Sequence, residues 1–421
     1  MTRLAPWFAA ALFAAAPFAA TPVVAQDLDV EVHGFAEFGA GTRLRDDPLQ
    51  DDDILLNEAR FRLELSHFTD RAELAFKSDF TADALAESVD VDVRQAVIVV
   101  RASDWLDVRA GRQVLTWGTG DLIFLNDLFP KDFVSFFIGR EDEYLKAPAN
   151  ALRLTFYSSL VNLDLVATPV FEADRSITGG RLSFFDPGTG SLESATSAGG
   201  ALTAARPSRE LGNGELAARL FRRVGGYELA LYGYVGFTKQ PLGFDPVADL
   251  PTYSPLDAYG ASIRGAVAGG IAHVETALYD GDDDEGDDPN VPNSQLRGLI
   301  GYERELAPDL TGSIQYYFER VLDHDQLLAA SPSPLFEPSQ TRHLITTRVT
   351  YRLLQQTLTT SLFVFASPND EDVYLRPSFS YSWSDALTVA GGANVMMGAD
   401  ATFFGQLERA SNVYLRARYS F

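Results

Sequence analysis

The chain of 421 residues contains no cysteine. It therefore has no disulfide framework, no thiolate metal site and no CxxCH haem attachment. Histidine is scarce as well, and neither a GxSxG nor an HExxH motif is present. Only the pair His324-Asp325, which has acidic neighbours, suggests a catalytic base of the kind an outer-membrane hydrolase uses. We expect no enzymatic activity, because the histidines are scattered along the chain: His33, His67, His273, His324 and His343.

Basic residues are few, with 34 Lys and Arg against 58 Asp and Glu and a formal net charge of -24. Such a balance argues strongly against nucleic acid as a partner. It fits a surface that faces cations or binds divalent ions. The 12% of aromatic residues and a mean hydropathy near zero fit a β wall with one side in lipid and the other in water.

Long apolar runs are absent after residue 26, where none reaches the roughly 18 residues of a membrane helix. Because a bilayer admits only helices or closed barrels, a membrane form of residues 26–421 would be a barrel. Residues 1–25 read as a secretory signal peptide, with Arg3, an apolar core from Trp7 to Ala20, and small residues before Gln26. An uncleaved anchor is the alternative, although this core is short. We expect export through the periplasm to the outer membrane of a Gram-negative cell.

Eighteen candidate strands follow, each near or above the length that a tilted strand needs to cross a bilayer. Short turns alternate with long polar loops, which is the sidedness of outer-membrane barrels. The sequence thus predicts an all-β, transmembrane, antiparallel up-and-down β-barrel with both termini on the short-turn side. The predicted strands are 30–42, 54–66, 71–82, 91–103, 105–118, 150–160, 161–171, 213–224, 227–238, 258–270, 271–280, 294–306, 310–322, 342–353, 356–367, 372–384, 386–398 and 411–421.

Apolar and charged residues alternate with period two along these strands. In 54–66, Phe61 and Leu63 point one way while Arg60 and Arg62 point the other. A charge facing lipid costs about 2–4 kcal/mol at mid-bilayer, so we expect the charged set to face the lumen. A soluble β-sandwich with one wet face is the alternative, but it does not explain the turn rhythm. The final strand alternates in the same way and ends on Phe421, which resembles the strand that the barrel-assembly machinery recognises in Gram-negative outer-membrane proteins.

The predicted lumen carries arginines faced by carboxylates, among them Glu58, Asp79 and Glu319. They could form a charged ladder that guides an ionic or polyhydroxylated solute, or a mutually paired wall without preference. These arginines are Arg60, Arg62, Arg94, Arg109, Arg153, Arg219, Arg297, Arg348, Arg352, Arg376, Arg416 and Arg418.

Residues 119–149 form a loop that is long and too apolar to lie in solvent, with Phe133, Phe136, Phe137 and Ile138 among its residues. A long loop of this kind is uncommon and usually functional. We expect it to fold into the lumen after the fifth strand and to narrow the pore. The predicted constriction residues are Arg112, Asp121, Asn126, Asp127, Lys131, Asp132, Arg140 and Glu141. Arg112 needs a bulge at Gly111 to reach the lumen, since strict alternation turns it to lipid; the alternative places it at the membrane edge.

The run Gly111-Arg112-Gln113, followed by Trp117-Gly118, Asp121, Asp127, Pro130 and Asp132, resembles the corresponding strand and loop of alginate-export-like and related uncharacterised outer-membrane porins. The resemblance covers some 25 residues and implies a monomeric barrel of about eighteen strands with a charged pore and an inward loop. This chain departs from it in its acidic balance and in the Trp-Gly pair.

Acidic runs at Asp280–Asp288 and Asp46–Asp53 lack EF-hand spacing, so we expect solvated outer loops, bridged loosely to lipopolysaccharide by ions such as Ca²⁺. No other cofactor and no specific metal site is expected. The function that these features predict is a channel for passive diffusion of small hydrophilic or anionic solutes. An exporter of an acidic, alginate-like polysaccharide and a closed structural or adhesive barrel are the alternatives.

Overall fold

The period-two segments form one closed sheet in the computed structural model, which describes residues 30–421. Eighteen strands pair antiparallel, and β1 pairs with β2 on one side and β22 on the other. Main-chain hydrogen bonds between Gly34 and Phe421 extend this seam. The barrel therefore has no free edge strand. The predicted fold class and strand number are confirmed, whereas the predicted signal peptide, residues 1–25, lies outside the described residues.

The barrel strands are β1 (Val30–Arg43), β2 (Ile54–Phe68), β3 (Ala72–Asp83), β4 (Ser88–Ser103), β5 (Leu106–Val114), β6 (Pro148–Phe156), β7 (Asn162–Thr168), β10 (Glu215–Val224), β11 (Tyr227–Phe237), β14 (Pro255–Val267), β15 (Gly270–Gly281), β16 (Gln295–Ala307), β17 (Leu310–Val321), β18 (Thr341–Leu353), β19 (Leu358–Ser367), β20 (Asp372–Ser382), β21 (Leu387–Met397) and β22 (Asn412–Ser420). The loops hold the hairpins β8 (Phe184–Asp186) with β9 (Ser191–Glu193) and β12 (Gly243–Asp245) with β13 (Leu250–Thr252), the helices α1 (Phe133–Ile138) and α2 (His324–Ala330), and the 3₁₀ turns η1 (Asp142–Leu145), η2 (Leu211–Asn213) and η3 (Gly405–Ala410).

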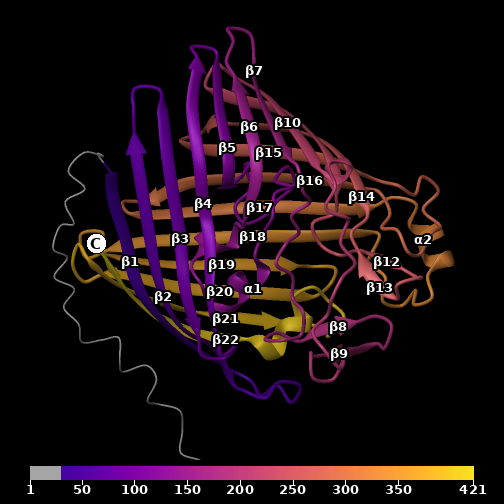
Figure 1. The fold of residues 1–421 in the computed structure, drawn as a ribbon. Helices are drawn as coiled ribbons and strands as arrows, with labels where there is room; N and C mark the ends of the chain where they lie inside the picture. Colours follow the sequence, from indigo (N-terminus) through magenta and orange to yellow (C-terminus); the bar gives the residue numbers. More distant parts are fainter. Residues whose placement is uncertain (1–29) are drawn as a thin grey trace, which may run out of the picture.

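Short and long connections lie at opposite ends of the barrel (Figure 1). The short end has tight turns such as Gly225-Gly226, where both glycines have positive φ and so suit a two-residue hairpin. At the other end the loop hairpins and α2 lie together over the mouth. The predicted sidedness is thus present in the structure.

The two faces of the wall differ as the alternation predicts. On β2, 43% of Phe61 is exposed on the outside, whereas only 2% of Arg62 is exposed on the inside. Ile300 and Leu415 continue the outer apolar surface on β16 and β22. A closed sheet with an apolar outside satisfies every backbone group internally, as a bilayer demands. Among residues 30–421 no helix is long and apolar enough to cross a membrane.

Some strands end earlier than predicted, for local reasons. Strand β6 stops at Phe156 because the Ser158 hydroxyl accepts the N–H groups of Leu160 and Val161 and makes a turn. Strand β7 stops just before Pro169, which has no N–H to donate to a ladder. Strand β5 ends at Val114 instead of residue 118, where the chain leaves the wall and enters the lumen.

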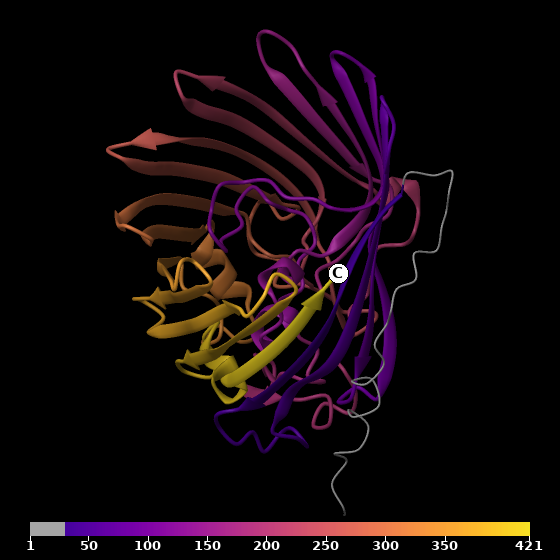
Figure 2. The same cartoon turned by 90° about the vertical axis from the view of Figure 1, so that its left-hand side faces the viewer.

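Figure 2 looks into the ring of strands, and the purple-to-magenta chain between β5 and β6 lies inside it. Residues 115–147 of this chain, here called the inward loop, contain α1 and η1. The predicted inward-folded loop after the fifth strand is confirmed. Its apolar residues are buried as expected, with Phe137 and Ile138 at or below 2% exposure.

Candidate functional site: the lumen and its inward loop

The first part of the inward loop is fastened to the wall opposite β5. The Glu275 carboxylate on β15 accepts hydrogen bonds from the N–H groups of Thr119 and Gly120. It also accepts one from Asn126 Nδ2 at 3.0 Å. Gln315 on β17 accepts the N–H of Asp121 at 2.7 Å. Because several of these donors are backbone amides, the wall fixes the path of the chain as well as its side chains.

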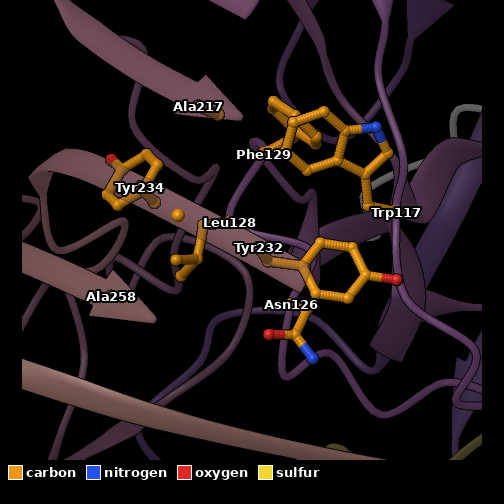
Figure 3. Close-up of a pocket in the computed structure, with 9 residues that line it drawn as sticks. Trp117, Asn126, Leu128, Phe129, Ala217, Tyr232, Tyr234 and Ala258 are labelled. Carbon is orange, nitrogen blue, oxygen red and sulfur yellow. The ribbon is translucent and has the colours of Figure 1, made fainter. Parts of the chain in front are cut away.

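An aromatic crevice lies beside this anchor (Figure 3). The Trp117 ring meets Phe129 edge-on, with centroids 5.0 Å apart, and also lies against Tyr232 of β11. The remaining space is about 10 Å³, room for about one water molecule. The crevice therefore holds the loop in place and has no room for a solute.

Helix α1 is the second anchor. It begins where the Asp132 carboxylate accepts the Ser135 N–H, and it ends at Gly139, which adopts the left-handed conformation. The rings of Phe136 and Phe137 pack against Tyr374 of β20, with centroids 5.8 and 5.6 Å apart. These contacts fill the long-loop end of the lumen over β19 to β22.

Two amides lock the carboxyl end of α1. Asn394 Nδ2 on β21 and Asn412 Nδ2 on β22 donate to the Phe137 carbonyl at 3.1 and 2.9 Å. Both asparagines are fully buried. They supply partners for a helix-end carbonyl that has no intrahelical one.

Four predicted constriction residues are buried and hold the loop together: Asn126, Asp127, Lys131 and Asp132. Lys131 Nζ donates to Asp127 Oδ1 at 3.0 Å and to the Phe129 carbonyl at 2.6 Å. This differs from the expectation that the four line open space, because a buried charge needs partners and these residues satisfy one another.

The loop that follows β7 contacts the buried residues Lys131 and Asp132 of the inward loop. Asp174 accepts the Lys131 N–H at 2.7 Å, and Arg175 lies 3.4 Å from the Asp132 carboxylate. Burial raises the pKa of Asp174 to about 6, although the positive charge of Lys131 acts to lower it. The inward loop is thus coupled to an outer loop through a buried carboxyl, an ion pair and main-chain hydrogen bonds.

The tip of the inward loop, residues 140–146, contacts both sides of the lumen. On the β2 side, Arg140 Nε donates to Glu58 at 3.0 Å, and Glu143 accepts from Arg62 Nη1 at 2.9 Å. Arg62 also forms a two-pronged pair with Asp79 of β3, at 2.6 and 2.8 Å. The Arg60 guanidinium lies 3.9 Å above the Tyr144 ring.

On the opposite side the loop tip meets a row of arginines. Asp142 accepts from Arg376 Nη2 of β20 at 2.7 Å, and Glu141 pairs with Arg418 of β22. Asp121 pairs with Arg348 of β18 at 2.8 Å. Burial raises the pKa of Asp121, and the Arg348 charge opposes that shift.

A cavity of about 470 Å³ lies along this arginine row and below the loop tip. Its polar wall carries hydroxyls near the short-turn ends of β19 to β22. Its lining includes Glu37, Arg140, Glu141, Asp142, Arg348, Thr359, Ser361, Phe363, Arg376, Ser378, Ser380, Thr388, Tyr414, Arg416, Arg418 and Ser420. Of the predicted constriction residues, only Arg140 and Glu141 line it, and Asp121 lies beside it through Arg348.

The remaining arginines predicted for the lumen lie elsewhere on the inner wall. Arg153 pairs with Asp164 at 2.7 Å, and its register partner Arg109 lies beside it on β5. Arg297 pairs with Glu319 at 3.2 Å and lies over the Tyr279 ring. Arg94 donates to the carbonyls of Glu143 and Lys146 in the loop tip.

The predicted lumenal position of Arg112 is wrong. Strand β5 pairs through Gly111 with no register shift on either side, and the bulge lies at Arg94 of β4 instead. Gly111 is needed because a Cβ there would lie 2.2 Å from the Ala96 carbonyl oxygen. Arg112 keeps the outward phase near the end of β5, where its Nη1 lies 3.5 Å from Glu172. This agrees with the alternative position at the membrane edge.

Several residues of the site escaped the sequence reasoning. Tyr144, Gln315, Asn394 and Asn412 hold the inward loop, and Arg181 reaches Glu58 from the loop after β7. An isolated amide on an inward phase, as at Asn394 and Asn412, was a signal that could have found two of them. Within residues 30–421 no group of three or more His, Cys, Asp or Glu side chains is arranged to hold a metal ion.

Several solved structures align with this chain over most of its length. OccD3 (OpdP) of Pseudomonas aeruginosa aligns over 93% of this chain and 91% of its own, with 10% identity and a TM-score of 0.53. The two chains therefore share a closed antiparallel β-barrel fold. The DcaP channel of Acinetobacter baumannii (12% identity, 93% and 97% coverage) and a mutant of the Rh. blastica porin (13%, 93% and 100%) align with TM-scores of 0.44 and 0.43. No protein-family model and no curated protein matches the sequence.

Proposed function

We propose that the protein is an outer-membrane channel for passive diffusion of small hydrophilic or anionic solutes, narrowed by residues 119–149. The observation that carries this proposal is the arginine row of β18, β20 and β22, which lines a polar cavity inside a closed barrel. Charged rings at a constriction favour ions of the opposite sign. Arg140, Arg348, Arg376, Arg416 and Arg418 line the cavity beside only three carboxylates, so its local balance is positive although the chain is acidic.

The sides of the inward loop have separate roles in this proposal. Its buried face, with Phe136, Phe137 and Lys131, fixes the position of the loop. Its tip, with Arg140, Glu141 and Asp142, sets the width and charge of the passage. Several other arginines of the inner wall are paired with carboxylates of the wall, as Arg153 is with Asp164 and Arg297 is with Glu319. Lipopolysaccharide and the barrel-assembly machinery are the partners we infer for the outer face and the final strand.

A closed barrel is the second candidate, because α1 and its aromatic neighbours fill the long-loop end over β19 to β22. Export of an acidic polysaccharide has less support. A cavity of about 470 Å³ matches a small solute better than a polymer strand. The alginate-export-like resemblance therefore suggests a shared architecture rather than a shared substrate.

The test is single-channel current of the refolded protein in a planar bilayer, with and without shortening of residues 121–146. We expect steady conductance from the native chain, and a larger, less selective conductance after shortening. A closed barrel would conduct only after shortening. No current from either protein would contradict the channel proposal.

A further inference from the structure

The arginines along the cavity and the loop carboxylates that face them differ in exposure. Only 9% of the Arg376 side chain and 11% of the Arg416 side chain are exposed. Their partners Asp142 and Glu141 are 49% and 41% exposed. The cations are thus part of the wall, whereas the anions stand at the edge of the cavity.

The arginines are held in place by groups other than these carboxylates. The Arg376 guanidinium lies 4.2 Å above the Phe136 ring, and the Arg418 guanidinium lies 3.9 Å above the Phe35 ring. Arg418 Nε also donates to Glu37 at 2.9 Å. Such stacking fixes planar guanidinium groups that bind carboxylates in a two-pronged manner. The anion-binding groups would therefore keep their places if the loop carboxylates moved away.

The row also has unused hydrogen-bonding capacity. Arg376 Nε and Arg416 Nε are buried, and neither has a hydrogen-bond partner among the described residues. Hydroxyls of Ser361, Ser378 and Thr388 line the same cavity. Its volume of about 470 Å³ falls in the range of pockets that bind small molecules.

We propose that Glu141 and Asp142 are internal occupants of an anion-binding site whose external ligand is a small dicarboxylate. The two loop carboxylates occupy the positions that a solute's carboxylates take at Arg376, Arg416 and Arg418. The ligand binds by displacing them, and the loop tip returns when it leaves. The inference rests on the channel function proposed above, because a solute reaches the cavity through the lumen.

Displacement is feasible because the ion pairs of the loop tip are weak. Asp142 and Glu141 are half exposed, so water solvates these carboxylates once they separate from the arginines, and a solute carboxylate takes their place on the cations. A dicarboxylate can occupy both carboxylate positions of the arginine row at once, whereas a monocarboxylate occupies only one. The site should therefore prefer two linked carboxylates over one.

The first test is calorimetric titration of the refolded protein in detergent with succinate, with acetate as the monoanion, at fixed ionic strength. We expect saturable binding of one succinate and at least tenfold weaker binding of acetate. Arg376→Gln and Arg416→Gln should each weaken succinate binding at least tenfold. Equal binding of acetate, or of inorganic phosphate, would overturn the assignment to dicarboxylates.

Removing the internal occupants should tighten binding. Glu141→Gln and Asp142→Asn should each lower the Kd for succinate three- to fivefold, which corresponds to about 0.7–1 kcal/mol, the upper range of an exposed ion pair. Glu143→Gln is the matched control. It removes the same charge from the same loop tip, but its partner Arg62 belongs to the opposite wall. We expect this control to change the Kd less than twofold.

An equal effect of Glu143→Gln would overturn the proposal, because it would show a general effect of net charge. An unchanged Kd in Glu141→Gln and Asp142→Asn would overturn it as well, provided that both variants fold, as judged by their heat-dependent gel mobility. Single-channel current separates the two proposals. Conductance without succinate binding or block overturns the binding site alone, and succinate binding without conductance overturns the channel alone.

Discussion

The two sides of the lumen use the same residue types in different ways. On the β2 side, Arg62 is buried and pairs with Asp79 of the neighbouring strand, so cation and anion both belong to the wall. On the β20–β22 side, Arg376 pairs with Asp142, a half-exposed residue of the loop. The first arrangement buries the arginine and its partner together in the wall, and the second leaves arginines within reach of a solute. Whether an arginine of the inner wall can bind a solute therefore depends on whether its carboxylate partner belongs to the wall or to the loop.

The largest expected effect on stability comes from breaking the buried ion pair between Arg62 and Asp79 on the β2 side. Arg62→Ala leaves Asp79 buried with only the longer contact to Arg60, at 3.7 Å. Removal of one partner of a buried pair costs about 3–5 kcal/mol. We expect the free energy of unfolding to fall by about 3 kcal/mol, measured by denaturant titration in lipid vesicles. Arg376→Ala is the comparison on the other side, and an equal loss there would contradict the distinction between the two sides.

A second prediction concerns the buried carboxyl that couples the inward loop to the loop after β7. The pKa of Asp174 is about 6 in the folded protein, against 3.8 as the reference value. The folded state therefore binds this proton more tightly than the unfolded state. Its stabilising contribution is full below pH 3.8 and disappears as the pH rises through 6. By linkage this amounts to at most about 3 kcal/mol between pH 4 and pH 7.

Asp174→Asn is the variant that isolates this effect, because Asn keeps an oxygen that can accept the Lys131 N–H. We expect the stability difference between the native chain and the variant to change across pH 4–7, with the native chain losing relative stability as the pH rises. Denaturant titrations at several pH values measure it. A difference that does not vary with pH would show that Asp174 does not titrate in this range.

The asparagine lock on α1 should have an intermediate effect. Asn412→Ala removes one of two buried donors to the Phe137 carbonyl, and a lost buried hydrogen bond costs about 1–2 kcal/mol. We expect the variant to expose the inward loop to protease while the barrel stays folded. Limited proteolysis followed by mass spectrometry locates the cuts, and cleavage confined to the outer loops would contradict this role.

The smallest effect is expected at the loop tip. Asp142→Asn removes a half-exposed partner of Arg376, and exposed pairs contribute about 0–1 kcal/mol. Its stability should therefore stay within 1 kcal/mol of the native chain in the denaturant titration used for Arg62→Ala. A loss as large as that of Arg62→Ala would mean that the Asp142–Arg376 pair stabilises the fold as much as the buried Arg62–Asp79 pair does.

The wall was predictable from sequence because period two is a local property. It placed Phe61 outside and Arg62 inside, and it gave the strand number and the sidedness of the loops. The path of the inward loop was not predictable, since its contacts join distant residues such as Asn126 with Glu275 and Phe137 with Asn412. Only the path of the loop decides that Lys131 is buried and that Glu141 is half exposed. The predicted position of Arg112 was wrong for a related reason. The bulge lies at Arg94 of the neighbouring strand, and the sequence around Arg112 does not contain that information.

The central claim is that the arginine row makes the narrowed lumen prefer anions. The direct measurement is the reversal potential of the reconstituted protein in a planar bilayer under a KCl gradient, compared between the native chain and the double variant Arg376→Gln/Arg416→Gln. We predict a potential of the sign that chloride selectivity gives, shifted toward zero or reversed in the variant. Cation preference in the native chain would contradict the claim and would show that the loop carboxylates set the selectivity.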